Sequence, residues 1–234
     1  MDMHDRSGSQ SHSRWDTSAT PMSRRSLLRG AARTGAAMAG VAVCAPLVAM
    51  LTACSDDIVN PSEHATITLG TELGALNLAY ALAQLEMDFY QRIIPNLYPG
   101  MLATEASAFT AFAASTPGQT NAIRRLILKG RIGDAMTFRF AQVINFADRT
   151  TVLTHATTIA ETTLGGYVSA RSELSTPDYV SAADEWIMSA EDRATRIRAM
   201  VGNADPVNPV AIPPADVMDA LKPYYQTTIT LRTV

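Results

Sequence analysis

Cysteine and histidine are scarce in this chain, which holds two Cys and four His in 234 residues. Cys44 lies within an uncharged apolar run, and Cys54 directly follows that run. If the chain is cut before Cys54, one cysteine remains, so neither an intramolecular disulfide nor a cysteine-based metal site can form. The stability of the folded part must then come from packing alone.

Basic charge is also scarce beyond the N-terminal segment. Residues 1–53 hold six Arg and three Asp, which leaves 13 basic and 19 acidic residues in 54–234, a formal charge of −6. No basic stripe is present, so we expect no nucleic-acid partner. Neither a Gly-x-Ser-x-Gly elbow nor a phosphate-binding glycine loop occurs, so no motif of these types indicates a hydrolase or a nucleotide-binding enzyme.

The N-terminal segment has the pattern of an export signal. The pair Arg24 and Arg25 precedes a run over residues 35–53 that contains no charged residue. The pair resembles a twin-arginine address, which a receptor reads. The run is only moderately apolar, whereas a spanning helix is usually richer in Leu, Ile and Phe. We predict a twin-arginine signal over residues 1–53; the alternative is an uncleaved N-terminal helix that anchors the chain in the membrane.

The end of this run resembles a lipobox, the motif that directs lipidation of a cysteine. It reads Leu51-Thr52-Ala53-Cys54. Several acyl chains on Cys54 would give a lasting anchor, because each buried methylene contributes about 0.8 kcal/mol. We predict an exported protein of the cell envelope, held on the periplasmic side of a membrane by a lipid on Cys54, with a tether over residues 54–64.

Helical periodicity dominates the rest of the chain, and Pro and Gly mark its breaks. Four long helices are predicted over residues 71–94, 120–146, 148–174 and 177–201, and two short ones over 105–114 and 214–224. The sequence Thr116-Pro117-Gly118 is expected to end the first short helix, and the Thr-rich residues 226–234 suit an extended conformation. Residues 65–234 are therefore predicted to form an all-α four-helix bundle with a short C-terminal helix.

Four carboxylates have apolar neighbours at helical spacing. Glu86 lies on the apolar stripe of the first predicted helix, and the others are Asp134, Glu161 and Glu191. A buried carboxylate without a partner is costly. One carboxylate on each of four helices therefore indicates a shared purpose, such as a metal site or a polar network.

The first predicted helix resembles that of the ferritin-like superfamily. Residues 76–90 read Leu-Asn-Leu-Ala-Tyr-Ala-Leu-Ala-Gln-Leu-Glu-Met-Asp-Phe-Tyr, and weaker similarity surrounds Glu161 and residues 190–194 and 213–224. The branch that it resembles contains plant desiccation-related proteins and twin-arginine-exported bacterial ferritin-like domain proteins. The resemblance covers roughly residues 65–225 and implies a ferritin-like four-helix bundle.

The resemblance also implies a place for a metal pair. Ferritin-like di-metal centres use one Glu from each of two helices and a Glu-x-x-His pair from each of the other two. Glu86 and Glu161 would take the single positions, and Asp134 and Glu191 would begin the two pairs. Neither of the last two is followed by a histidine three residues later, and the chain contains no Glu-x-x-His at all.

Two interpretations of these four carboxylates remain open. A carboxylate-only site would take a hard cation such as Mn, Mg or Ca in preference to iron. A degenerate site would instead have its carboxylates protonated, or paired with Arg131 or Arg193. We expect the degenerate site, with no catalytic residue and no cofactor. Arg193, Arg196 and Arg198 are otherwise expected on a solvated face near a helix C-terminus, where positive charge is favourable.

Together these expectations describe a membrane-tethered ferritin-like lipoprotein with a degenerate di-metal site. Its expected role is that of a non-catalytic scaffold or docking subunit for a membrane-protein partner in an envelope complex. The alternative is a divergent metal-binding ferritin-like protein that acts in oxidase, peroxide or iron chemistry, or in stress protection, through a carboxylate-only site. The sequence leaves open whether the protein is an enzyme, and the missing histidines weigh against it.

Overall fold

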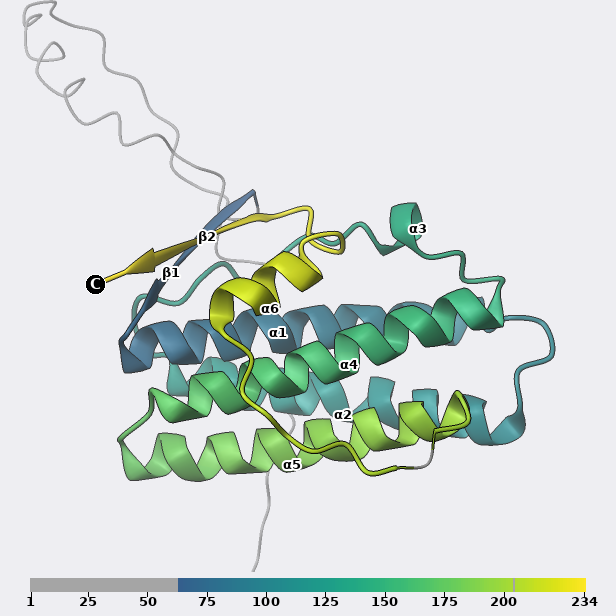
Figure 1. Cartoon of the computed structure of the whole chain (residues 1–234). Coiled ribbons are helices and arrows are strands. Elements are labelled where there is room, and N and C mark those ends of the chain that lie inside the picture. Colours follow the sequence, from purple (N-terminus) through teal and green to yellow (C-terminus); the bar gives the residue numbers. More distant parts are fainter. Residues whose placement is uncertain (1–62, 204) are drawn as a thin grey trace, which may run out of the picture. The chain divides into compact units, whose positions relative to one another are not determined.

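Six α-helices, one 3-10 turn and two strands make up the part of the chain that the computed structural model describes, residues 63–203 and 205–234 (Figure 1). In chain order they are β1 (His64–Leu69), α1 (Glu72–Ile93), η1 (Ile94–Asn96), α2 (Ala103–Leu126), α3 (Phe140–Val143), α4 (Arg149–Ser172), α5 (Pro177–Met200), α6 (Pro214–Leu221) and β2 (Thr228–Thr233). The long helices α1, α2, α4 and α5, followed by the short α6, confirm the predicted all-α bundle. The predicted signal, the lipobox and most of the tether lie outside the described residues.

The bundle is connected by two short turns and one long crossover. Short connections join α1 to α2 and α4 to α5, whereas residues 127–148 run back along the bundle from the end of α2 to the start of α4 (Figure 1). A single crossover of this kind is an established way to connect four helices. Within the described residues, no helix is both long enough and apolar enough to cross a membrane.

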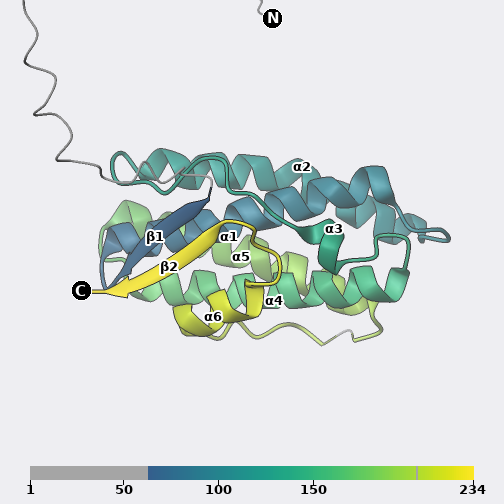
Figure 2. The ribbon, with the colours of Figure 1, turned by 90° about the horizontal axis from the view of Figure 1, so that it is seen from above.

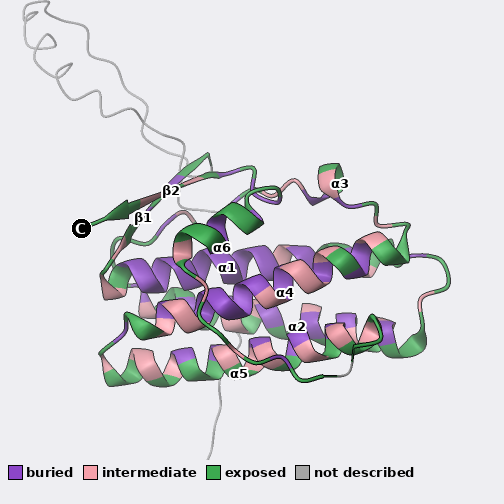
Figure 3. Ribbon diagram, in the orientation of Figure 1, coloured by how far each residue is buried: buried purple, intermediate pink, exposed green. Residues whose placement is uncertain are grey.

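Helix α1 is the most buried element of the bundle. Thr71 caps its start, because its hydroxyl oxygen accepts a hydrogen bond from the Gly74 amide at 2.9 Å. Most of its residues are buried, including those on several sides of the helix (Figure 3). A helix that is buried nearly all round has no solvated face for polar side chains. Each buried polar side chain on α1, Glu86 among them, therefore needs a partner inside the protein.

Helix α2 differs from the prediction of a short helix over 105–114 that ends before Pro117. It continues through Pro117 to Leu126. Pro in a helix interior costs about 3 kcal/mol, because one hydrogen bond is lost and the ring clashes with the preceding turn. A continuous buried stripe on both sides of Pro117 offsets that cost. The stripe consists of Phe109, Phe112, Thr116, Thr120 and Ile123.

The predicted helix over residues 120–146 does not form as such. Only its first turns belong to α2, and most of residues 127–139 are irregular. Gly130 has a φ of +72°, a left-handed conformation that glycine adopts without steric cost. The apolar periodicity of this stretch comes from side chains such as Ile132 and Met136 that pack on the bundle without a helix.

Two side-chain amides on α1 hold this irregular segment in place. Asn77 donates to the carbonyl of Gly130 at 2.9 Å and accepts from the amide of Ile132 at 3.1 Å. Seven residues further along α1, Gln84 makes the same pair of bonds with a carbonyl and an amide of the segment, both at 3.3 Å. Buried backbone groups need partners, and these amides replace the partners that a helix would have supplied.

Helices α4 and α5 begin and end within two residues of their predicted bounds. Asp148 caps α4 by accepting from the Thr151 amide at 2.7 Å. Gly166 permits a close approach of α1 and α4, because a Cβ there would lie 2.5 Å from the Leu82 side chain. Helices α1 and α4 therefore pack closely at the level of the polar residues described below.

The two ends of the described region lie side by side in a small parallel sheet. Strand β1 pairs with β2 in a register that places His64 opposite Thr228 and Leu69 opposite Thr233. The sheet and α6 lie over the side of the bundle formed by α1 and α4 (Figures 1 and 2). Strand β2 falls within the predicted extended tail, whereas β1 was not predicted, because six residues of alternation are a weak signal.

Candidate functional site

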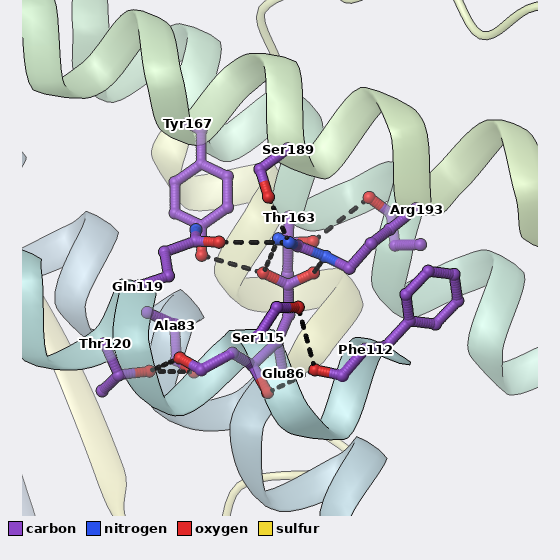
Figure 4. A network of polar contacts seen from close by, with 12 residues as sticks. Ala83, Glu86, Phe112, Ser115, Gln119, Thr120, Thr163, Tyr167, Ser189 and Arg193 are labelled. Atoms are coloured by element: carbon purple, nitrogen blue, oxygen red, sulfur yellow. Dashed lines mark hydrogen bonds and ion pairs between the residues drawn. The ribbon is translucent and has the colours of Figure 1, made fainter. Parts of the chain in front are cut away.

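A buried ion pair lies inside the bundle. Glu86 on α1 and Arg193 on α5 have side chains that are only 1% and 2% exposed. Arg193 donates from Nη2 to Glu86 Oε2 at 2.9 Å and from Nε to Oε1 at 3.1 Å (Figure 4). The two bonds make a bidentate contact, the stronger and more directional form of an arginine–carboxylate pair.

Side chains from α2 and α4 complete the network around this pair (Figure 4). Tyr167 on α4 donates its hydroxyl proton to Glu86 Oε2 at 2.9 Å. Arg193 Nη1 donates to Gln119 Oε1 on α2 at 3.1 Å and to Ser189 Oγ on α5 at 2.9 Å. Each of the four long helices therefore contributes a side chain to one polar network, which fixes how the helices sit against one another.

Burial and charge together set the protonation of this network. Burial opposes the charge on Arg193, but the adjacent Glu86 carboxylate outweighs it and raises the arginine pKa above its usual value. Burial, with the nearby Glu86 charge, raises the pKa of Tyr167 well above its usual value. Tyr167 is therefore a neutral donor to Glu86 at all ordinary pH values.

Two polar atoms beside the network have no hydrogen-bond partner within the described residues. They are Tyr90 Oη and Gln119 Nε2. Burial raises the pKa of Tyr90, so its phenol stays protonated. An amide nitrogen and a neutral phenol are not the oxygen ligands that hard divalent cations prefer. Internal water commonly satisfies groups of this kind.

Asp134, one of the predicted ligands, does not point into this network. It lies in the crossover segment, 47% exposed, and accepts from Arg131 Nε at 2.8 Å. The Tyr80 hydroxyl donates to it at 2.9 Å. Arg131 is the main reason that the pKa of Asp134 is lowered. Burial, followed by the hydrogen bond to Asp134, raises the pKa of Tyr80 to about 12.

The remaining two predicted ligands lie apart from the buried pair. Glu161 on α4 forms an ion pair with Arg198 on α5, with side chains 32% and 27% exposed. Glu191 is partly buried on α5. In residues 63–203 and 205–234, no three His, Cys, Asp or Glu side chains come together in a way that could hold a metal ion.

The donor atoms near Glu86 do not fit a di-metal centre. A divalent cation at Glu86 would lie beside the guanidinium of Arg193, and the two positive charges would repel each other. Ala194 and Thr137 stand where the resemblance would require histidines. Ala194 has no donor atom in its side chain, and the Thr137 hydroxyl lies 3.3 Å from that of Thr227.

Arg193 is not on a solvated face, contrary to the expectation from sequence. Arg196 on the same helix is exposed and Arg198 is partly exposed, as expected, but Arg193 is buried. A signal for this was present in the sequence, because buried positions of α5 recur at three- and four-residue steps that include Arg193. These positions are Ala183, Trp186, Ala190, Arg193 and Ile197.

A second deeply buried carboxylate, Glu105, was not predicted, although it lies four residues before Phe109 and seven before Phe112 on one face of α2. Its side chain is 2% exposed and accepts from the Tyr98 hydroxyl at 2.7 Å and from Arg149 Nε at 3.1 Å. Burial raises its pKa, but the bonds from Arg149, Tyr98 and the Leu102 amide outweigh burial, and the net shift is downward. Glu105 thereby ties the start of α2 to the start of α4.

Comparison with known proteins gives one match that covers this architecture. The family model described as a ferritin-like domain matches residues 71–203, which is more than half of the chain and includes all four long helices. No curated protein matches the chain.

Proposed function

Because the chain belongs to the ferritin-like domain family, we propose that it is a member in which a buried ion pair stands where relatives hold metal. We propose further that it acts as a non-catalytic scaffold or docking subunit of an envelope complex. The observation that carries this proposal is the Glu86–Arg193 pair, in which both carboxylate oxygens accept from one guanidinium.

The energetics of the pair support a structural role. Isolated buried charges cost several kcal/mol each, and only good geometry with further hydrogen bonds compensates. Here Tyr167, Gln119 and Ser189 supply those bonds from three helices. A metal at Glu86 would have to displace Arg193 and leave its charge buried without a partner. The network therefore favours a fixed bundle over a metal-dependent reaction.

We also propose that a lipid on Cys54 tethers the bundle to the periplasmic side of a membrane. The lipobox and the similarity of the first helix to twin-arginine-exported relatives support this. Ten residues separate Cys54 from His64, so the tether reaches at most about 33–36 Å. Helix α4, with 24 residues, is about 36 Å long. The bundle would thus stay within about one helix length of the membrane surface, close to membrane-protein partners.

Metal analysis tests the scaffold proposal. The full chain, purified from solubilised membranes, would be incubated with Mn²⁺ or with anaerobic Fe²⁺, desalted and subjected to elemental analysis. We expect far less than one metal ion per chain. One or two ions per chain that disappear in Glu86→Ala but persist in Glu185→Ala, a control at an exposed carboxylate, would contradict the proposal and support the metal-handling alternative.

Acyl labelling tests the tether. Cells fed an alkyne-tagged palmitate should label the chain. In Cys54→Ala, the label should be lost, and the chain should no longer be recovered in the membrane fraction. Cys44→Ala is the matched control and should keep both. Equal labelling of the two variants would contradict lipidation at Cys54, and membrane recovery without label would support the uncleaved helix.

A further inference from the structure

Residues from the start of α2 and the end of α5 line an open groove. These two helix ends lie at the same end of the bundle (Figure 1). The volume of the groove is about 650 Å³, within the range of about 300–1,000 Å³ that ligand sites commonly have. Helix α2 packs mainly on α1, and α5 packs mainly on α4, whereas α2 and α5 make much less contact with each other. The groove therefore occupies the most loosely packed edge of the bundle.

Apolar side chains form just over half of the groove lining. Its apolar lining residues are Leu102, Ala103, Ala108, Ala111, Ala199 and Met200. Four alanines leave room for a slender apolar chain along the groove, where larger side chains would fill the space. Leu102 at the mouth is 57% exposed, so part of this apolar surface faces water.

Two arginines line the groove, and each is paired with one carboxylate. Arg149 is held in place by Glu105 and by the Met200 carbonyl, to which its Nη2 donates at 2.8 Å. Arg196 is 52% exposed and binds Asp192 through Nε at 3.1 Å. Within the described residues, the two Nη groups of Arg196 donate no hydrogen bond to the protein. These Nη groups lie beside the apolar lining and can bind an anion from solution.

We propose that this groove binds a free fatty acid of medium chain length. Its alkyl chain would lie against the alanines of α2 and α5, and its carboxylate would accept hydrogen bonds from the Nη groups of Arg196, a charge-assisted contact. The Nη groups of Arg196 favour an anionic head, and the apolar lining favours an alkyl tail. This inference is independent of the scaffold role, because it involves neither Glu86 nor Arg193.

Photo-crosslinking tests the proposal on the full chain in its membrane. The probe is a dodecanoate that carries a diazirine and a terminal alkyne, and labelled peptides are mapped by mass spectrometry. Saturable labelling is expected within residues 102–111 and 196–200, and unlabelled dodecanoate should compete. Decanoate should compete about fifteenfold more weakly, because it has two fewer methylenes to bury. The matching diazirine-bearing alcohol, which has no charge, should label weakly.

Four variants locate the site. Arg196→Gln should raise the concentration of the dodecanoate probe that gives half-maximal labelling by about tenfold, because a charged hydrogen-bond donor is lost. Asp192→Asn should lower this concentration by releasing Arg196. Arg232→Gln, at an exposed arginine on β2, should leave it unchanged. Ala111→Trp should abolish labelling by filling the groove. Ala114→Trp, at an exposed position of the same helix outside the groove, should not.

Three results would overturn the inference. The first is equal labelling by the alcohol and the carboxylate, which would indicate non-specific partition into apolar surface. The second is labelling that Ala111→Trp does not reduce. The third is a dimer, detected by sedimentation, that dissociates in Ala111→Trp but not on addition of dodecanoate. The groove would then be an interface between two copies of this chain.

Discussion

Glu86–Arg193 and Glu161–Arg198 are two of the three carboxylate–arginine pairs that join α5 to its neighbours, and they differ in burial more than in chemistry. Glu86 and Arg193 are 1% and 2% exposed, whereas Glu161 and Arg198 are 32% and 27% exposed. A pair in contact with water contributes about 0–1 kcal/mol. Removing one partner of a buried pair costs about 3–5 kcal/mol, because the other charge stays buried alone. Position in the bundle, and not the residue type, therefore decides which of these carboxylates matters to the fold.

The buried pair should give the largest response to substitution. Arg193→Met leaves Glu86 buried without its partner, so the free energy of unfolding should fall by about 3–5 kcal/mol. Urea denaturation followed by circular dichroism measures this. The matched control is Arg196→Met on the exposed side of the same helix, which should change stability by less than about 0.5 kcal/mol. Equal losses in the free energy of unfolding for the two variants would contradict the expected difference between a buried and an exposed arginine.

Glu105 should fall between the two pairs, because it is buried but its partner Arg149 is 43% exposed. Glu105→Gln keeps an acceptor for Tyr98 and loses the charged contact, so the expected cost is about 1.5–3 kcal/mol. Glu185→Gln, at an exposed position on α5, serves as the control in the same urea titration. If Glu105→Gln lowered the free energy of unfolding by less than Glu161→Gln, burial of the carboxylate alone would not determine how much stability each substitution removes.

Glu161→Gln should have a small effect, about 0–1 kcal/mol. Water can solvate Arg198 once its partner is neutral, so no buried charge is left behind. The measurement is the same urea titration, repeated at high salt, where wild type and variant should converge because exposed charges are screened. A loss of more than about 2 kcal/mol in the free energy of unfolding that salt does not reduce would show that Glu161 acts as a partner in a buried ion pair, as Glu86 does.

Glu72 should show a small effect that depends on pH. Its carboxylate accepts from the amides of Ser175 and Thr176 at 2.6 and 2.7 Å. These bonds lower its pKa from 4.5 to about 2. Since the folded pKa lies below the unfolded one, its contribution is present above pH 4.5 and is lost as pH falls toward 2.

Thermal melts of Glu72→Gln test this linkage. At pH 7 the variant should melt slightly below wild type, and the gap should close as the pH is lowered to 2. Asp178→Asn, an exposed acid in the first turn of α5, controls for general loss of negative charge. A gap of constant size over this range would mean that the hydrogen bonds from Ser175 and Thr176 do not favour the charged form.

Much of the fold could be predicted, because periodicity and capping residues act locally. Thr71, Asp148 and Pro177 mark the starts of α1, α4 and α5 in the sequence as in the structure. The irregular crossover could not be predicted, because its backbone is satisfied by Asn77 and Gln84, about 50 residues away along the chain. Apolar spacing alone does not distinguish such a segment from a helix.

The site was predictable in part. Glu86 stands out because a carboxylate interrupts an apolar stripe, and the expectation of a degenerate site named Arg193 as one possible partner, with which the structure pairs it. Arg193 lies on an equally clear stripe, but its charge and its arginine neighbours 196 and 198 favour a solvated face. Glu105 also lies on a stripe, four residues before Phe109 and seven before Phe112, but no local pattern shows its partner Arg149 on another helix. Pairing between distant charges is the part that local patterns do not contain.

A double-mutant cycle on Glu86 and Arg193 tests the central claim most directly. The cycle compares Glu86→Gln, Arg193→Met and the double variant by urea denaturation of the full chain. The two single changes should not add: the double variant should be more stable than their sum implies by about 2 kcal/mol or more, within the range for residues in direct contact. Additivity within about 0.5 kcal/mol would show that the two side chains do not pair in the core.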